Sequence, residues 1–168
     1  MSRILIAGAS RGIGLELARQ YSAQGDEVIA CARDTGAAQA LQDLASGTDN
    51  ITVEALDLGD PESIAAAGER ISGAIDAVIV VGGVFGGMQQ SLDDVDIAEW
   101  HKTLNVNTIG PMLTARAFKP HLVASGDGKL MILTSQLAAS TWPMGGMYIY
   151  STTKAAVSKV GQILALVV

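Results

Sequence analysis

The sequence predicts an α/β fold, in which helices cover both faces of a parallel β-sheet. Short runs rich in Val, Ile and Leu recur along the chain, and the stretches between them have the apolar spacing of helices. Each run is almost continuously apolar, which is typical of a strand that is buried on both faces. Nineteen glycines and only 4% aromatic residues also favour close packing of helices on strands over a β-sandwich.

Five strands are predicted along the chain. Their ranges are Arg3 to Ala7, Glu27 to Ala32, Ile51 to Leu56, Ala77 to Val81 and Lys129 to Thr134. Between the third and fourth strands, Asp60 can cap a helix and Pro61 fits its first position. The apolar face of that helix is marked by Ile64, Ala67 and Ile71.

Two longer helical stretches follow. The first runs from about Asp93 to His121, and Gly110-Pro111 lies inside it, so we expect a kink next to Asn107. The second runs from Tyr150 to Val168. The chain has 168 residues and no recognisable linker or repeat, so we expect a single domain over residues 1–168.

The charge balance limits the kind of partner. Eleven Lys and Arg residues stand against seventeen Asp and Glu residues, which gives a formal net charge of −6, and the basic residues do not cluster. This pattern argues against a surface for nucleic acid or for an anionic membrane. We therefore expect a small molecule as the partner, with no nucleic acid and no membrane.

Cysteine and histidine are scarce in the sequence. Cys31 is the only cysteine, which excludes an internal disulfide and a Cys-based zinc site and suits a reducing cytoplasm. His101 and His121 are the only histidines, and no metal site is expected. The apolar start is too short for a signal peptide, and no stretch reaches the ~18 apolar residues of a membrane helix, so we expect a cytoplasmic protein.

A glycine-rich segment, Gly8-Ala9-Ser10-Arg11-Gly12-Ile13-Gly14, follows the first strand and opens a helix. Glycine at the turn lets the main chain approach a pyrophosphate, and the helix N-terminus offers free N–H groups and the positive end of its dipole. This placement predicts a dinucleotide phosphate site. The residues expected to form it are Gly8, Ser10, Arg11, Gly12, Ile13 and Gly14.

A candidate pair for proton transfer lies near the end of the chain. Tyr150 and Lys154 are four residues apart and so share one face of a helix. An ammonium beside a phenol favours its ionised form, which lets the phenol act as an acid or a base. Ser135 lies at the carboxyl end of a predicted strand, where open α/β sheets bind ligands, and could hydrogen-bond a substrate oxygen.

Further motifs accompany the glycine-rich segment. They are Asp57-Leu58 after the third strand, Asn105-Val106-Asn107, Thr134-Ser135 and Tyr150-Ser151-Thr152-Thr153-Lys154. With the glycine spacing, their order resembles that of the short-chain dehydrogenase/reductase family of the classical type. The resemblance covers essentially the whole chain and implies a Rossmann-type doubly wound parallel sheet with the strand order 3-2-1-4-5.

The resemblance also implies an activity. A member of this family would be an NAD(P)-dependent oxidoreductase that interconverts a carbonyl and a secondary alcohol by hydride transfer, here on a small, mostly apolar substrate. Tyr150 would be the proton donor or acceptor, and Lys154 would hold the nicotinamide ribose. Ser135 would orient the substrate oxygen, and Asn107 would support the proton relay.

The resemblance implies further cofactor contacts at Asp57, Leu58, Gly82 and Gly83, with Asp57 at the adenine. The end of the second strand indicates which cofactor is used. Ala32 stands where a chain that binds NAD usually has an acid for the ribose hydroxyls, and Arg33 follows it. Arg33 can pair with a 2′-phosphate and Arg11 can approach the same group, so NADP is predicted rather than NAD.

The loop before Tyr150 has two open features. Ser135 lies fifteen residues before Tyr150, slightly more than is common in the family, and Tyr148 at the more usual offset lacks a matching lysine. Tyr150 remains the predicted proton donor. Several apolar side chains of the loop either line a substrate pocket or pack within the loop itself, namely Trp142, Met144, Met147 and Tyr148.

The last residues, Leu166-Val167-Val168, lie within or just after the predicted helix that carries Tyr150. The family usually continues with further strands and a segment that covers the substrate, so we expect a C-terminally truncated member whose fifth strand is an exposed edge. Association through residues 107–121 and 150–166 into a homodimer or homotetramer would bury apolar surface. The alternative is a catalytically inactive nucleotide-binding or interaction protein.

Overall fold

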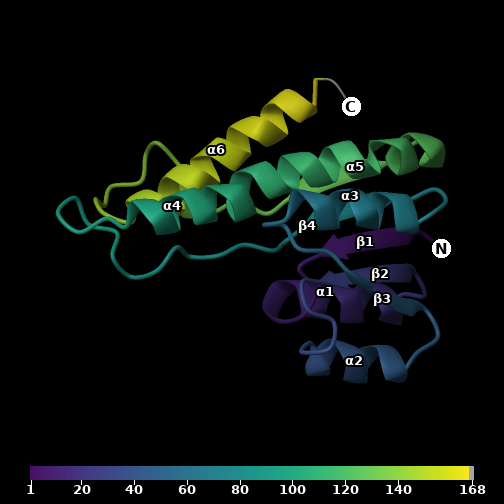
Figure 1. Cartoon of the computed structure of the whole chain (residues 1–168). Coiled ribbons are helices and arrows are strands. Elements are labelled where there is room, and N and C mark those ends of the chain that lie inside the picture. The colour runs from purple at the N-terminus through teal and green to yellow at the C-terminus, as the bar shows by residue number, and fades with distance from the viewer. Residues whose placement is uncertain (167–168) are drawn as a thin grey trace.

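The computed structural model describes residues 1–166 and contains a five-stranded parallel sheet (Figure 1). Its strands are β1 (Arg3–Ala7), β2 (Glu27–Ala32), β3 (Ile51–Ala55), β4 (Ala77–Val80) and β5 (Lys129–Ile132). They pair in the order β3-β2-β1-β4-β5, which confirms the predicted fold class and strand order. The last three strands end one or two residues earlier than predicted.

Helices cover both faces of this sheet (Figure 1). Helices that contact its strands include α1 (Gly12–Ala23), α2 (Gln39–Ser46), α3 (Pro61–Arg70) and α5 (Gly110–Ser125). Ala18 of α1 and Leu41 of α2 belong to the apolar cluster on one face, and Phe118 of α5 belongs to the cluster on the other. All three side chains are fully buried, so the sheet is the middle layer of three.

The start of α3 has the predicted cap. The Asp60 side chain accepts a hydrogen bond from the backbone N–H of Glu62 at 2.9 Å, and Pro61 is the first helical residue. Ile64 and Ala67 are buried against the sheet, which confirms the predicted apolar face.

The helix predicted from about Asp93 to His121 consists of three continuous segments. They are α4 (Ile97–Leu104), a π-helical turn (Asn105–Ile109) and α5. The helix begins later than predicted because Asp96 caps it, accepting a hydrogen bond from the N–H of Glu99 at 3.1 Å. It also continues past His121 to Ser125, where Gly126 ends it in the left-handed conformation.

The predicted irregularity next to Asn107 is this π-helical turn. The N–H of Gly110 donates to the carbonyl of Asn105, five residues earlier, and Pro111 has no N–H to donate. A Cβ on Gly110 would lie 2.2 Å from the carbonyl oxygen of Leu58, so only glycine lets the helix pack this closely on the segment after β3. The turn places Asn107 inside the protein, where its side chain is 1% exposed.

The last helix, α6 (Tyr148–Leu164), begins two residues before the predicted start at Tyr150. It lies beside α5, and its first turn projects beyond the sheet together with the start of α4 and the loops before both helices (Figure 1). Val167 and Val168, which the prediction included in this helix, lie outside the described residues.

The apolar runs predicted burial on both faces, which is wrong for the edge strand β3, whereas the fifth strand was also expected to be an exposed edge, as β5 is. β1, β2 and β4 are buried almost throughout, whereas β3 and β5 alternate with exposed or half-buried residues. In β5, Leu130 and Ile132 pack against the cluster under α5, while Met131 is 44% exposed on the other face. The physical reason is that an edge strand has a neighbour on only one side, and among residues 1–166 no helix covers the second face of β5.

Two chemical properties of the described residues bear on function. Within residues 1–166, no helix combines the length and the apolar character needed to cross a membrane, and no group of three or more His, Cys, Asp or Glu side chains is placed to hold a metal ion. Cys31 is fully buried in β2, and burial raises the pKa of its thiol to about 12. The thiol is therefore protonated near neutral pH and is no nucleophile.

Candidate functional site

The glycine-rich segment forms a tight turn between β1 and α1. Gly8 has a φ of +100°, and a Cβ on it would lie 2.5 Å from the backbone nitrogen of Gly82 at the end of β4. A Cβ on Gly14 would lie 2.1 Å from the carbonyl oxygen of Gly8. The segment thus packs main chain against main chain, which brings the N-terminus of α1 to the carboxyl edge of the sheet.

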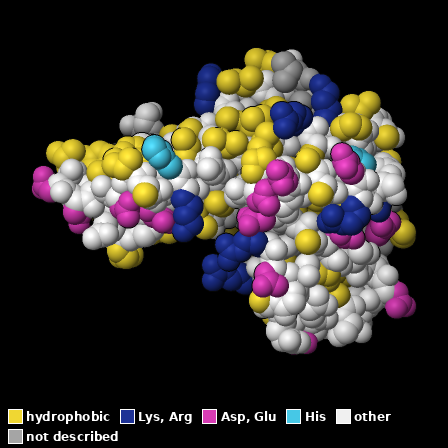
Figure 2. Space-filling view, viewed as in Figure 1, with side chains coloured by type: hydrophobic (Ala, Val, Ile, Leu, Met, Phe, Trp, Pro, Cys, Tyr) yellow, Lys and Arg dark blue, Asp and Glu magenta, His cyan; other side chains and the backbone are white. Residues whose placement is uncertain are grey.

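The N-terminus of α1 is free to accept an anion. Its first turn contains no acidic residue, and no side chain caps it. Arg11 stands at the N-cap position, and Arg33 follows β2 on the same edge of the sheet. Neither guanidinium makes a hydrogen bond or an ion pair with the rest of the described chain. Figure 2 shows dark blue side chains gathered where the projecting part joins the body.

A cleft of ≈ 600 Å³ lies along this edge. The predicted cofactor residues that line it are Gly8, Ser10, Arg11, Gly12, Ile13, Arg33, Asp57, Leu58, Gly82 and Gly83. Gly14 is buried behind the turn instead. The structure therefore brings together, in one cleft, residues that come from the ends of four different strands.

The sequence analysis did not predict some residues that line the cleft. They are Leu56, Val81, Val84, Lys102, Val106 and Leu133. Val84 directly follows Gly82-Gly83 and could have been included on that ground, whereas nothing local distinguishes Lys102. Its Nζ lies 3.3 Å from a carboxylate oxygen of Glu99, and only the tertiary packing of α4, which contacts α6, brings it to the cleft.

Asp57 lines the cleft and also shapes the turn that leads into α3. Its carboxylate accepts the N–H of Gly59 at 2.8 Å, and its own N–H donates to the hydroxyl of Ser63 at 3.0 Å. These bonds hold the carboxylate at the cleft wall. The adenine contact of Asp57 stays a prediction.

A second pocket of ≈ 420 Å³ contains Tyr150 and Lys154. It shares wall residues with the first cleft, namely Arg11, Val81, Gly83, Val84 and Leu133. The two cavities are therefore neighbours at the carboxyl ends of the strands. Phe85 and Thr134 also line the second pocket.

Lys154 is held close to the Tyr150 ring. Its ammonium donates a hydrogen bond to the carbonyl of Leu133 at 2.8 Å and lies 6.0 Å from the centroid of the ring. The side chain is 4% exposed, and burial lowers the pKa of the amine below its ordinary value of 10.5. The predicted pair is thus brought together in the pocket, as the spacing on one helix face requires.

Asn107 lies behind the wall that the two cavities share. Its side-chain oxygen accepts the N–H of Val84 at 2.8 Å, and its amide donates to the carbonyl of Val84 at 2.8 Å and to the hydroxyl of Thr153 at 3.2 Å. Asn107 therefore fixes the main chain of a cleft residue and ties it to α6. The predicted role in a proton relay stays untested.

Ser135 lies just after β5 and caps a short 3₁₀ turn (Gln136–Ala138). Its hydroxyl oxygen accepts the N–H of Leu137 at 3.2 Å. Thr134, and not Ser135, lines the pocket with Tyr150. The structure thus brings Tyr150 and Lys154 together but does not place Ser135 on the wall of their pocket.

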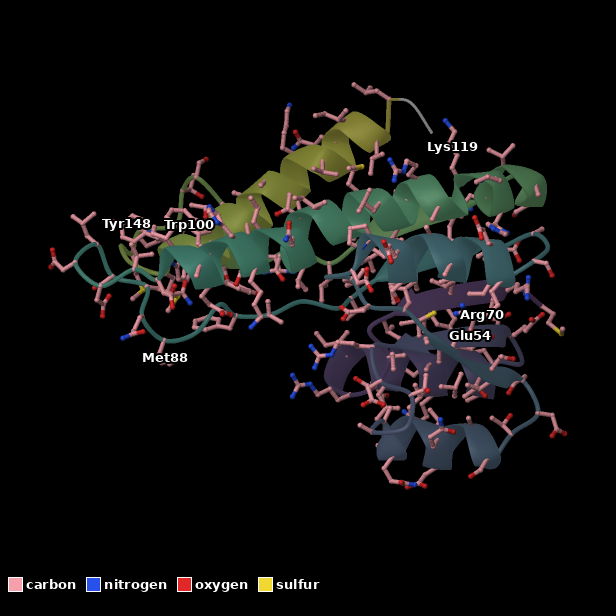
Figure 3. The ribbon with its side chains drawn as sticks, in the orientation of Figure 1. Glu54, Arg70, Met88, Trp100, Lys119 and Tyr148 are labelled. Carbon is pink, nitrogen blue, oxygen red and sulfur yellow. The ribbon has the colours of Figure 1, made fainter. Side chains whose placement is uncertain are left out.

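The apolar residues that were predicted to lie in the loop before Tyr150 do not line either cavity, and Tyr148 is in fact the first residue of α6. Trp142, Met144, Met147 and Tyr148 line neither one, and all but Trp142 are exposed. Figure 3 labels Tyr148 and Met88 in the projecting part of the molecule, away from the sheet. The described structure therefore does not show these residues as walls of a substrate pocket.

Comparison with known proteins defines the class to which this architecture belongs. Residues 2–167 match the short chain dehydrogenase family. The chain therefore belongs to the short-chain dehydrogenase/reductase family, as its motifs and strand order indicated.

Two relatives show how similar the sequence is to other members of the family. The chain is 35% identical over 169 residues to 1-hydroxy-2-glutathionyl-2-methyl-3-butene dehydrogenase of Rhodococcus sp. (strain AD45), a match that covers 96% of this chain and 69% of the relative. It is 34% identical over 165 residues to an uncharacterized oxidoreductase of Schizosaccharomyces pombe, with 91% of this chain and 62% of the relative covered. The chain thus spans less than two thirds of the length of that relative.

Solved structures agree with the fold. A carbonyl reductase from Pseudomonas aeruginosa PAO1 superposes with a TM-score of 0.85 at 30% identity, covering 98% of this chain and 76% of that one. An NADPH-bound carbonyl reductase from chicken fatty liver superposes with a TM-score of 0.88 at 27% identity, covering 99% of this chain and 70% of that one.

Proposed function

We propose that the protein is an NADP(H)-preferring oxidoreductase that interconverts a carbonyl and a secondary alcohol on a small, mostly apolar substrate. The observation that carries the proposal is the shared wall between the glycine-lined cleft and the pocket of Tyr150 and Lys154. A dinucleotide in the cleft would extend to a proton donor in the pocket. The NADPH-bound carbonyl reductase among the structural neighbours supports the same reading.

The residues of the cleft fit a dinucleotide. A side chain at Gly8 would fill the turn, the N–H groups at the start of α1 are uncapped, and the guanidiniums of Arg11 and Arg33 have no partner within the described residues. Gly12 and Gly82 would lie against the phosphates and the adjoining sugar, and Asp57 against the adenine. When bound, the nicotinamide cofactor supplies or accepts the hydride.

The proposed roles of the pocket residues follow from their contacts. In reduction, the Tyr150 hydroxyl gives its proton to the substrate oxygen while the carbonyl carbon gains the hydride, and the Lys154 ammonium offsets the negative charge left on the phenolate. Lys154 would also hold the nicotinamide ribose. The Ser135 oxygen already accepts the N–H of Leu137, so its own O–H is the group that can orient the substrate oxygen. Oxidation of the alcohol runs the same proton transfer in reverse.

The test is a comparison of two tyrosine variants. Purified protein is incubated with NADPH and a panel of aldehydes and ketones, and NADPH consumption is followed. We expect Tyr150→Phe to lower turnover about 100-fold or more, because general acid catalysis contributes at least that much. Tyr148→Phe is the matched control, since Tyr148 is exposed and lines neither cavity. Equal turnover by the Tyr150 variant and the wild type would refute the assignment.

The proposed preference for NADP(H) has its own test, the variant Arg33→Ala. Loss of a charge-assisted hydrogen bond of about 1.5–3 kcal/mol corresponds to a loss of roughly 10- to 150-fold in NADPH affinity. NADH has no 2′-phosphate, so its affinity should stay the same. Arg19→Ala is the control, because Arg19 pairs with Glu16 on α1 away from the cleft. Calorimetric titration that finds equal losses for both nucleotides would contradict the proposed contact.

A second candidate is a nucleotide-binding protein without turnover. It is favoured by the position of Ser135, which does not line the pocket of Tyr150. Saturable NADPH binding without turnover of any carbonyl in the panel, by wild type and variants alike, would establish this candidate in place of the first.

We further propose that the protein forms a homodimer or homotetramer through α5 and α6. Exposed apolar side chains lie on or next to these helices, among them Ile109, Val123 and Ile163. Figure 2 shows hydrophobic side chains along the projecting part. Sedimentation equilibrium of the purified chain would distinguish these states from a monomer.

A further inference from the structure

Gln90 is a buried polar residue that has no place in the proposed chemistry. It lies in the loop between β4 and α4 and is 4% exposed. Its side-chain amide donates to the carbonyls of Phe85 at 2.9 Å and Gly87 at 2.8 Å. Its side-chain oxygen accepts the backbone N–H of Tyr150 at 3.0 Å. Both N–H groups and the oxygen of this amide are therefore engaged.

The start of α6 needs acceptors from outside the helix. The residue before it, Met147, has a φ of +54° and offers no side-chain cap. The N–H groups of the first turn have no partner within the helix. Gln90 supplies two acceptors, its backbone carbonyl for the N–H of Tyr148 at 3.4 Å and its side-chain oxygen for that of Tyr150. A residue 60 positions earlier in the chain thus caps the helix that carries the proposed proton donor.

The same side chain holds the loop that contacts the Tyr150 ring. The rings of Phe85 and Tyr150 lie 5.2 Å apart between centroids and are tilted by 35°, and both residues line the second pocket. A Cβ on Gly86 would lie 2.5 Å from a methyl carbon of Ile149, so the loop packs directly on the first turn of α6. The bonds from Gln90 to the carbonyls of Phe85 and Gly87 fix the main chain on both sides of this contact.

We infer that Gln90 is a positioning residue for Tyr150. Its side-chain oxygen holds the backbone N–H of Tyr150 in place. Its amide holds the main chain of Phe85, and with it the ring against which the phenol packs. A displacement of a reacting group by about 1 Å can lower the reaction rate up to about 100-fold. A side chain that fixes both the backbone of Tyr150 and the Phe85 ring therefore affects turnover without touching the substrate. The inference rests on the proposed function of Tyr150, and its test includes a measurement that does not depend on turnover.

Two substitutions separate the two contacts of Gln90. Gln90→Met keeps the size of the side chain and removes every hydrogen bond. Gln90→Glu keeps an acceptor for the N–H of Tyr150, where a carboxylate also suits a helix N-terminus, but cannot donate to Phe85 and Gly87. Gln89→Met is the matched control, because Gln89 is the neighbouring residue, is exposed and makes no side-chain hydrogen bond within the described residues.

The readouts are kcat per NADPH-binding site, the Kd for NADPH by calorimetry, and hydrogen exchange of the peptide that spans residues 147–152. We expect Gln90→Met to lower kcat about 10- to 100-fold, to leave the Kd for NADPH unchanged and to speed amide exchange in that peptide. We expect Gln90→Glu to lower kcat as well but to keep the slow exchange. Gln89→Met should change none of the three.

Unchanged exchange and unchanged kcat in Gln90→Met would overturn the inference, and so would an equal loss in Gln89→Met. If the wild type shows no turnover at all, the proposed function fails, and the exchange measurement still decides whether Gln90 caps α6. A loss of NADPH binding in parallel with kcat would show a general structural role instead and would also overturn the inference.

Discussion

Replacing Asn107 by Leu is expected to destabilise the wall that the two cavities share. Asn107 is 1% exposed, and its amide makes two hydrogen bonds to the main chain of Val84 and one to Thr153. Leucine has a similar size but cannot replace them. Each net hydrogen bond is worth about 0.5–1.5 kcal/mol, and a buried group left without a partner costs about 1–3 kcal/mol. Because Val84 is half-buried and water can reach part of it, we expect a total loss of about 2–4 kcal/mol in the free energy of unfolding.

Urea denaturation with a circular dichroism readout measures this loss, and the midpoint of thermal unfolding should fall by about 5–15 °C. Asn105→Leu is the matched control, since Asn105 lies in the same π-helical turn, is exposed and makes no side-chain hydrogen bond within residues 1–166. Asn107→Asp keeps an acceptor for the N–H of Val84 but cannot donate to the Val84 carbonyl or to Thr153, so it should also destabilise the protein. The reasoning would be refuted if Asn107→Leu and Asn105→Leu unfolded at the same urea concentration.

Two further outcomes are expected. Gly8→Ala should lower the midpoint of thermal unfolding more than Gly12→Ala. Both glycines have a positive φ, but only a Cβ at Gly8 would meet a neighbouring backbone, that of Gly82. Equal losses in the two variants would contradict the close approach of Gly8 to Gly82. Burial lowers the pKa of Lys154 in the folded state, so the unfolded chain binds this proton more tightly. The free energy of unfolding of the wild type, relative to that of Lys154→Met, should therefore rise with pH between the lowered pKa and 10.5. A difference that stays constant in urea denaturation across this range would exclude the effect.

Much of the fold could be predicted because its signals are local. The apolar runs predicted each strand to within two residues at its end, and Asp60-Pro61 marked the start of α3. The family's motif order supplied the strand order, which the pairing of β1 with β2 and β4 confirms. The glycine-rich segment predicted the cleft residues well, because it forms a single turn whose atoms are neighbours in the chain as well as in space.

The site itself could be predicted only in part. The four-residue spacing of Tyr150 and Lys154 was enough to place them together, since one helix carries both. Ser135 was expected beside them, but its distance from Tyr150 in the chain leaves its position to the loop between β5 and α6, and Thr134 lines the pocket instead. Likewise, Lys102 reaches the cleft only because of the tertiary packing of α4, which contacts α6.

The sequence by itself determined the strands, the cap of α3, the turn at the N-terminus of α1 and the family to which the chain belongs. All of these depend on neighbouring residues or on motif order. Only the tertiary structure decided which backbone groups Asn107 and Gln90 bind and which face of β5 is left uncovered. The physical reason is that a hydrogen bond between residues 23 or 60 positions apart depends on how whole elements pack, and no local pattern in the chain records that packing.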